Sequence, residues 1–139
     1  MYKFSKLSKR RMKGVDSRLI SIAELALKRS PCDFGIAWMG GKRTAREQYD
    51  LFLKKRSQKD GYNRLSKHQF GEALDILPYV NGEPKELKNY YLIVIGVFFA
   101  CANELGYTLR SGANWDKDQV WLTDQSFDDY PHLEIVNSG

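Results

Sequence analysis

The longest apolar run in the chain is "YYLIVIGVFFACA", residues 90–102, and it limits what the chain can fold into. As a helix it would be about 20 Å long at 1.5 Å per residue, which is short of the roughly 30 Å hydrocarbon core of a membrane. Asn103 and Glu104 follow it directly, and Gly106 can cap its C-terminal end. We therefore predict a buried core helix over residues 86–105 rather than a membrane span.

The rest of the composition fits one globular domain. A chain of 139 residues forms a stable core without disulfide bonds. Hydrophobic residues make up 42% and charged residues 28%, which argues against a disordered chain. Cys32 and Cys101 are too few for a disulfide framework and lack metal-ligand spacing, so we expect both to be reduced.

The net charge of +5 is unevenly distributed, because the first 13 residues contain cations and no acid. These cations are Lys3, Lys6, Lys9, Arg10, Arg11 and Lys13. Such a segment is either a solvated, mobile end or an element attracted to an anionic polymer or membrane surface. It lacks the apolar core of a signal peptide, so we expect synthesis in the cytoplasm without an export signal. We divide the chain into a basic N-terminal tail, residues 1–13, and a single domain, residues 14–139.

Helices and short strands fill the domain without strict alternation. One helix is predicted to begin at Asp16 or Ser17 and to reach Arg29, and another covers residues 45–56 after a capping box at Thr44. Strands are predicted at residues 34–39, 73–78, 107–110 and 132–136, with loops at 57–67 and 112–129. This mixture predicts an α+β fold in which helices flank a small, mainly antiparallel sheet.

A single carboxylate interrupts one of these strands, because Asp75 lies between Leu74 and Ile76 in "ALDILP". Burying an unpaired charge costs several kcal/mol or more, so Asp75 needs a partner. The chain has only two histidines, His68 and His132, and each lies at the edge of a predicted strand. Two neutral imidazoles and one carboxylate are a common ligand set for a catalytic zinc ion.

The spacing of His68 and Asp75 permits a shared metal but does not require one. Seven residues is an odd number, so an uninterrupted strand would direct the two side chains to opposite faces. Gly71 allows a bend that turns the histidine back over the strand. From residue types alone, a capping or core histidine and an aspartate paired with an arginine are the alternatives.

Longer motifs extend this pattern. The string Ser66-x-His68-x-x-Gly71-x-Ala73-x-Asp75, followed by Asp129-x-x-His132, closely resembles the zinc-dependent D-alanyl-D-alanine carboxypeptidases and L-alanyl-D-glutamate endopeptidases of peptidoglycan. "KRTAREQYDLF" resembles the arginine-threonine motif of the same family, and "LRSGANWDKD" resembles the segment before its final histidine. Together these motifs cover most of residues 38–136 in the family's order. In its short length, the chain is most similar to the stand-alone endolysins of bacteriophages.

The resemblance implies a fold like that of the Hedgehog and DD-peptidase domains, and a role for each matching residue. The residues that match the ligands of Zn²⁺ are His68, Asp75 and His132. Asp129 matches the general base, although the adjacent Asp128 is the alternative, and Arg43 matches the arginine that contacts the substrate carbonyl or oxyanion. The residues that would support this machinery or contact the substrate are Ser66, Thr44 and Gln48.

The function implied is zinc-dependent hydrolysis of peptidoglycan stem peptides, at the L-alanyl-D-glutamate bond, by a phage lysis enzyme. A D-alanyl-D-alanine carboxypeptidase is the first alternative, and a non-catalytic cell-wall or nucleic-acid binding module is the second. No nucleic-acid motif is present, so we expect no nucleic acid partner. We expect a monomer whose basic tail is attracted to the anionic envelope and which reaches the wall after the membrane is permeabilised.

The segment "DKDQVWLTDQSFDD", residues 116–129, contains five aspartates. It is either a solvated acidic loop, or a weak cation site or lid over the substrate, since oxygen-rich loops suit calcium.

Overall fold

The computed structural model of the chain describes residues 2–112 and 129–137. Its helices are α1 (Lys6–Arg11), α2 (Ser17–Arg29), α3 (Ala45–Leu53) and α4 (Lys88–Leu105), with a 3₁₀ turn η1 (Lys67–Phe70). Its strands are β1 (Asp33–Ile36), β2 (Ala73–Val80), β3 (Glu83–Pro84), β4 (Thr108–Ser111) and β5 (His132–Val136). The predicted α+β class is confirmed, and both cysteines are free, as expected.

The strands form one antiparallel sheet in the order β1-β2-β5-β4, and β3 pairs with the far end of β2. The central pairing of β2 with β5 joins segments that are more than fifty residues apart in the chain. Its register places Asp75 directly opposite His132. Directly opposed residues of an antiparallel pair direct their side chains to the same face of the sheet, so the register brings these two polar residues together.

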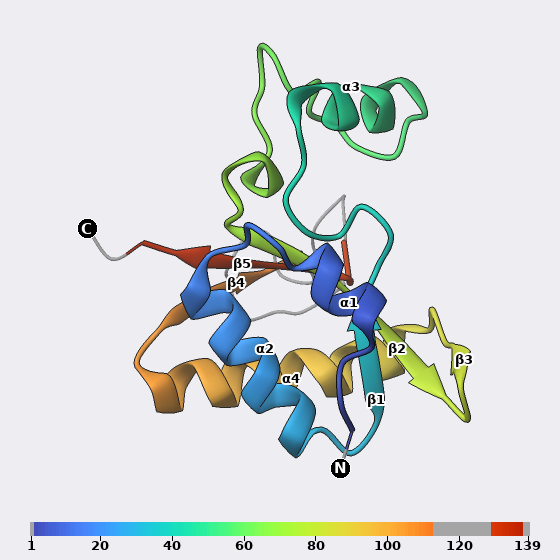
Figure 1. The fold of residues 1–139 in the computed structure, drawn as a ribbon, viewed down its shortest axis with the longest axis vertical. Coiled ribbons are helices and arrows are strands. Elements are labelled where there is room, and N and C mark those ends of the chain that lie inside the picture. The colour runs from blue at the N-terminus through green and yellow to red at the C-terminus, as the bar shows by residue number, and fades with distance from the viewer. Residues whose placement is uncertain (1, 113–128, 138–139) are drawn as a thin grey trace.

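One face of the sheet is covered by α2 and α4, which cross on the same side of it in Figure 1. Leu74 and Ile76 point to this face and are completely buried in the hydrophobic core, as are Leu133 and Phe98. The core helix α4 was therefore predicted correctly, although it begins at Lys88. In the described ranges, no helix combines the length and the apolar character needed to cross a membrane. Because side chains alternate along a strand, Asp75 points to the opposite face, away from this core.

The basic N-terminal segment packs against the sheet. Ser5 caps α1, and the buried hydroxyl of Ser8 accepts a hydrogen bond from the backbone N–H of Ile36 at 3.1 Å. Arg11 donates to the carbonyl oxygen of Ile36 at 2.8 Å, and Met12 is part of the hydrophobic core. The expectation of a solvated, mobile end therefore does not hold for these residues, whereas the division of the chain into a tail and one domain stays a prediction.

Residues 44–66, hereafter the arm, project from the body of the molecule and carry α3 (Figure 1). The predicted capping box begins this helix: Glu47 N donates to the Thr44 hydroxyl at 3.1 Å, and Thr44 N donates to the Glu47 carboxylate at 2.9 Å. The helix ends at Leu53, three residues before the predicted end, because Lys55 takes a left-handed backbone conformation with φ of 59°. The segment that leads from the arm back to β2 contains η1.

Candidate functional site

Three side chains meet on the face of the sheet away from the core. The Nε2 atom of His68 lies 3.2 Å from Asp75 Oδ1 and 3.2 Å from His132 Nδ1, and His132 Nδ1 lies 3.4 Å from Asp75 Oδ1. Asp75 and His132 reach this point from opposed positions on β2 and β5, and His68 reaches it from η1. His68 and His132 are buried, and Asp75 is nearly so.

The bend predicted at Gly71 brings His68 over the strand. Gly71 ends η1 in the left-handed region with φ of 70°, and a Cβ atom there would lie 2.5 Å from the carbonyl oxygen of Gly14. Both features restrict this position to glycine. Ser66 caps the start of η1, where its hydroxyl accepts a hydrogen bond from the backbone N–H of His68 at 3.2 Å. Ser66 therefore supports the backbone of a site residue.

In each histidine, the outer ring nitrogen, which is the one that points away from the other two side chains, lies next to a hydrogen-bond acceptor. His68 Nδ1 lies 2.9 Å from the carbonyl oxygen of Gly41, which can only accept, so Nδ1 carries the proton and Nε2 carries the lone pair. His132 Nε2 lies 2.9 Å from the carboxylate of the buried Glu134, which fixes its proton on Nε2 and leaves Nδ1 as the inner atom. Ligating histidines typically show this arrangement, in which an acceptor orients the ring and raises its basicity.

The inner atoms fit a metal ion. With both imidazoles neutral, three acceptors face one another at 3.2–3.4 Å with no donor among them, an arrangement that a metal ion between them would stabilise. Zinc bonds of about 2.0–2.1 Å at the tetrahedral angle separate ligand atoms by about 3.3–3.4 Å, which matches the spacing found. His68, Asp75 and His132 therefore form a group that can hold a metal ion.

The electrostatics of the group favour an ionised Asp75 and a protonated His132. Burial alone would raise the pKa of Asp75, but His68 and His132 outweigh it and hold that pKa well below its usual range. Burial lowers the pKa of His132, whereas its hydrogen bonds to Asp75 and Glu134 raise it, to about 9. A proton on His132 and a metal ion thus satisfy the same negative field, and metal binding would release this proton.

Arg43 contacts the second carboxylate oxygen of Asp75, the one that does not face the histidines. Its Nη2 donates to Asp75 Oδ2 at 3.0 Å, its Nη1 to Gln48 Oε1 at 2.9 Å, and its Nε to the Met39 carbonyl at 2.7 Å. The residue types left open whether Asp75 pairs with an arginine or with the histidines. The structure shows both contacts, because Oδ2 of Asp75 accepts from Arg43 and Oδ1 faces the two histidines. A guanidinium has five N–H groups, and two of those of Arg43 make no hydrogen bond to residues 2–112 or 129–137.

Asp129, the predicted base, lies three residues before the start of β5 and interacts electrostatically with Asp75, His132 and Arg43. Burial and the negative charge of Asp75 raise its pKa to about 6, while His132 and Arg43 oppose the rise. Its own carbonyl oxygen accepts a hydrogen bond from His132 N at 3.1 Å, which holds the start of the strand. The alternative base, Asp128, and nearly all of the predicted acidic loop lie outside the described residues.

The structure thus gathers His68, Asp75, His132, Arg43 and Asp129, and adds two groups that the sequence did not reveal. Glu134 could have been found from its spacing, because residues two apart on a strand point to the same face. The Gly41 carbonyl carries no side-chain signal. The two remaining predicted residues lie further out. Thr44 uses its hydroxyl to cap α3, and Gln48 connects Arg43 to the arm.

Comparison with known proteins identifies the family and the fold of the chain. The family model described as phage L-alanyl-D-glutamate peptidase matches residues 1–136. The chain is 33% identical over 144 residues to the L-alanyl-D-glutamate peptidase of Escherichia phage T5, covering 97% of this chain and 98% of that one. The crystal structure of the L-Ala D-Glu endopeptidase of Serratia marcescens superposes with a TM-score of 0.77 at 22% identity, covering 96% of this chain and 90% of the other, and shares its fold.

Proposed function

The chain belongs to the phage L-alanyl-D-glutamate peptidase family, and from this premise we propose that it is a zinc peptidase whose metal is held by His68, Asp75 and His132. The observation that carries the proposal is the convergence of three acceptor atoms at 3.2–3.4 Å, with the outer nitrogen of each histidine tied to an acceptor. This donor set is typical of catalytic zinc sites, which keep one position open for water or substrate.

The proposed substrate is the stem peptide of peptidoglycan, and the proposed bond is the one between L-alanine and D-glutamate. The relative from phage T5 bears the name of this activity and aligns over nearly its whole length. Such an activity in a phage is that of a lysis enzyme. We expect the protein to be made in the host cytoplasm, to act as a monomer, and to reach the wall once another protein has permeabilised the membrane.

In this proposal, the metal ion, Asp129 and Arg43 have separate chemical roles. A zinc ion would supply Lewis acidity, which makes water acidic near neutral pH. Asp129 would take a proton from the attacking water and deliver it to the leaving amine of D-glutamate. A pKa near 6 suits this work, because the carboxylate is ionised at neutral pH and still basic enough to accept a proton.

Arg43 would have two tasks. Its bond to Asp75 Oδ2 fixes the aspartate so that Oδ1 faces the histidines. Its remaining N–H groups would donate to the carbonyl oxygen of the scissile bond as negative charge develops there. Loss of one stabilising donor of this kind costs on the order of a hundredfold or more in rate.

Metal removal and return tests the proposal. Protein treated with a strong chelator should lose activity on a soluble stem-peptide substrate and regain it with about one equivalent of zinc. His68→Ala should neither bind the equivalent nor regain activity, whereas the exposed Lys28→Ala should behave as the wild type. Full turnover by protein that elemental analysis shows to be metal-free would remove the proposal.

A further inference from the structure

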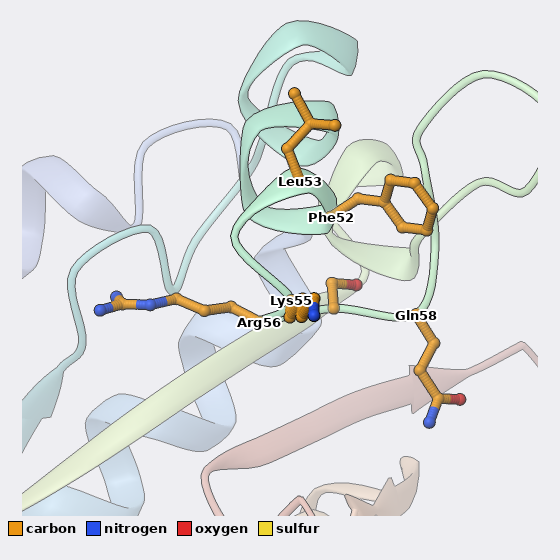
Figure 2. A pocket seen from close by; sticks show the side chains of 6 residues that line it. Phe52, Leu53, Lys55, Arg56 and Gln58 are labelled. Atoms are coloured by element: carbon orange, nitrogen blue, oxygen red, sulfur yellow. The ribbon is translucent and has the colours of Figure 1, made fainter.

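A hollow of about 630 Å³ lies at the C-terminal end of α3, in the arm. The residues that line it are Phe52, Leu53, Lys55, Arg56, Ser57 and Gln58 (Figure 2). Two of these residues are cations and none is an acid. The surrounding sequence from Leu51 to Lys59 contains four cations and no acid, which makes this the most basic stretch beyond the N-terminal segment.

The two cations of the hollow are exposed and uncompensated. Within the described ranges, neither Lys55 nor Arg56 takes part in an ion pair. In Figure 2, Arg56 extends to the left and Gln58 downward from the turn, and Lys55 lies between them. Phe52 and Leu53 are 39% and 58% exposed, so apolar surface lies beside the charges.

Lys55 occupies a position where lysine is unfavourable for the backbone. Its N–H bonds to the Phe52 carbonyl at 3.0 Å, and Arg56 N bonds to the Leu51 carbonyl at 2.9 Å, as in a Schellman motif. The residue at this point takes a left-handed conformation, with φ of 59° here, and is usually glycine. A lysine at this position, despite the backbone cost, is consistent with a side chain that binds a ligand.

The hollow is joined to the catalytic groups through one buried amide. Gln48 donates from Nε2 to the hydroxyl of Ser57 at 2.8 Å and to the carbonyl oxygen of Lys59 at 2.8 Å. On its other side, Gln48 Oε1 accepts from Arg43, which binds Asp75. A wall of the hollow, at Ser57, is therefore connected to Arg43 through the single side chain of Gln48.

We propose that this hollow binds the acidic part of the stem peptide, on the leaving-group side of the scissile bond. The inference rests on the proposed function and specifies how its substrate is placed. Up to the scissile bond, L-alanine is joined to the sugar by a neutral amide, so that side of the substrate offers no carboxylate. The carboxylates of D-glutamate and of the residues after it all lie beyond the bond, where two uncompensated cations would attract them.

The experiment uses zinc-loaded protein and two soluble muramyl peptides. One peptide has free carboxylates beyond the scissile bond, and in the other these carboxylates are amidated. The double variant Lys55→Gln/Arg56→Gln is compared with Lys28→Gln/Lys88→Gln, which removes two exposed charges from α2 and α4 and so matches the change in net charge. Steady-state kinetics give KM and kcat for each pair, and cleavage products are identified by mass.

The hollow variant should raise KM for the acidic peptide roughly three- to tenfold, with kcat and the amidated peptide unaffected. An equal change for both peptides, or the same change in the control variant, would overturn the subsite while leaving the peptidase intact. Failure of the wild type to cut either peptide would remove the proposed function, and the subsite with it.

Discussion

His132 and Glu134 lie two residues apart on β5, and both are buried on the face of the sheet that carries the site. The carboxylate fixes the imidazole proton on Nε2, so Nδ1 remains for a metal. Glu134→Gln should therefore weaken zinc binding about 10- to 100-fold, because the ring loses its charged acceptor. Competition against a chromophoric chelator measures this affinity. Glu83→Gln on the exposed β3 is the control, and an unchanged affinity in Glu134→Gln would show that the carboxylate does not orient the ring.

Asp129 should be distinguishable from Asp128 by rate. Asp129→Asn should lower kcat by about 10²- to 10⁴-fold, since asparagine cannot accept the proton, whereas Asp128→Asn should retain most of the rate. Because burial and Asp75 raise the pKa of Asp129 to about 6, ionised base is present above that pH. A bound cation lowers this pKa, so the activity of the zinc-loaded wild type should fall at a pH below about 6. The reverse result for the two variants would move the base to Asp128.

The proposed metal ligands were predictable from the sequence, but most of the groups that hydrogen-bond to them were not. Asp75 was identifiable because a charge among buried strand residues needs a partner. The acceptor for His68 is the backbone carbonyl of Gly41, and no pattern of residue types can identify a carbonyl. The predicted contact of Arg43 with the substrate stays a prediction, to which the structure adds its bond to Asp75.

Among the elements, the end of α3 offers the most direct test of local strain. Lys55→Gly should stabilise the protein by about 0.5–1 kcal/mol, because glycine adopts the left-handed conformation without penalty. Lys54→Gly, one residue earlier at φ of −82°, should give no such gain. Urea unfolding measures both. Equal effects of the two substitutions would contradict the account of this turn.

The elements that were predicted correctly are those specified locally. The caps at Asp16, Thr44 and Gly106 stand in the sequence next to the helices they bound, and all three are present. The helix α1 was missed because its support is distant in the chain, through the contacts of Ser8 and Arg11 with Ile36. A run of cations without an acid gives no local sign of such packing.

At the scale of the whole molecule, α1 lies against the loop that orients His68. A Cβ atom on Gly41 would overlap the carbonyl oxygen of Arg11, so the end of α1 lies directly against the loop whose carbonyl orients His68. Deleting residues 1–13 should therefore destabilise the fold by at least about 2 kcal/mol, from the loss of buried Met12 alone. Thermal unfolding measures the loss, and a truncated protein as stable as the full chain would contradict this packing.

Replacement of charge is the informative test of attraction to the anionic envelope. Glutamine in place of the exposed cations of this segment removes the charge and leaves Ser8, Arg11 and Met12 in place. The residues to replace are Lys3, Lys6, Lys9, Arg10 and Lys13. The variant should fold normally and bind cell walls less well at low salt, with the difference disappearing at high salt. Equal binding at every salt concentration would exclude this role of the charge.

The sheet separates the two tasks of the molecule, because one face packs against α2 and α4 and the other carries the site. The central claim is that this second face cuts the bond between L-alanine and D-glutamate with a metal held by His68, Asp75 and His132. Mass spectrometry of purified peptidoglycan after incubation tests it most directly, with chelator-treated protein and His132→Ala alongside. New termini at that bond, absent from both controls, are the expected result. Loss of terminal D-alanine, or the same products in the controls, would contradict it.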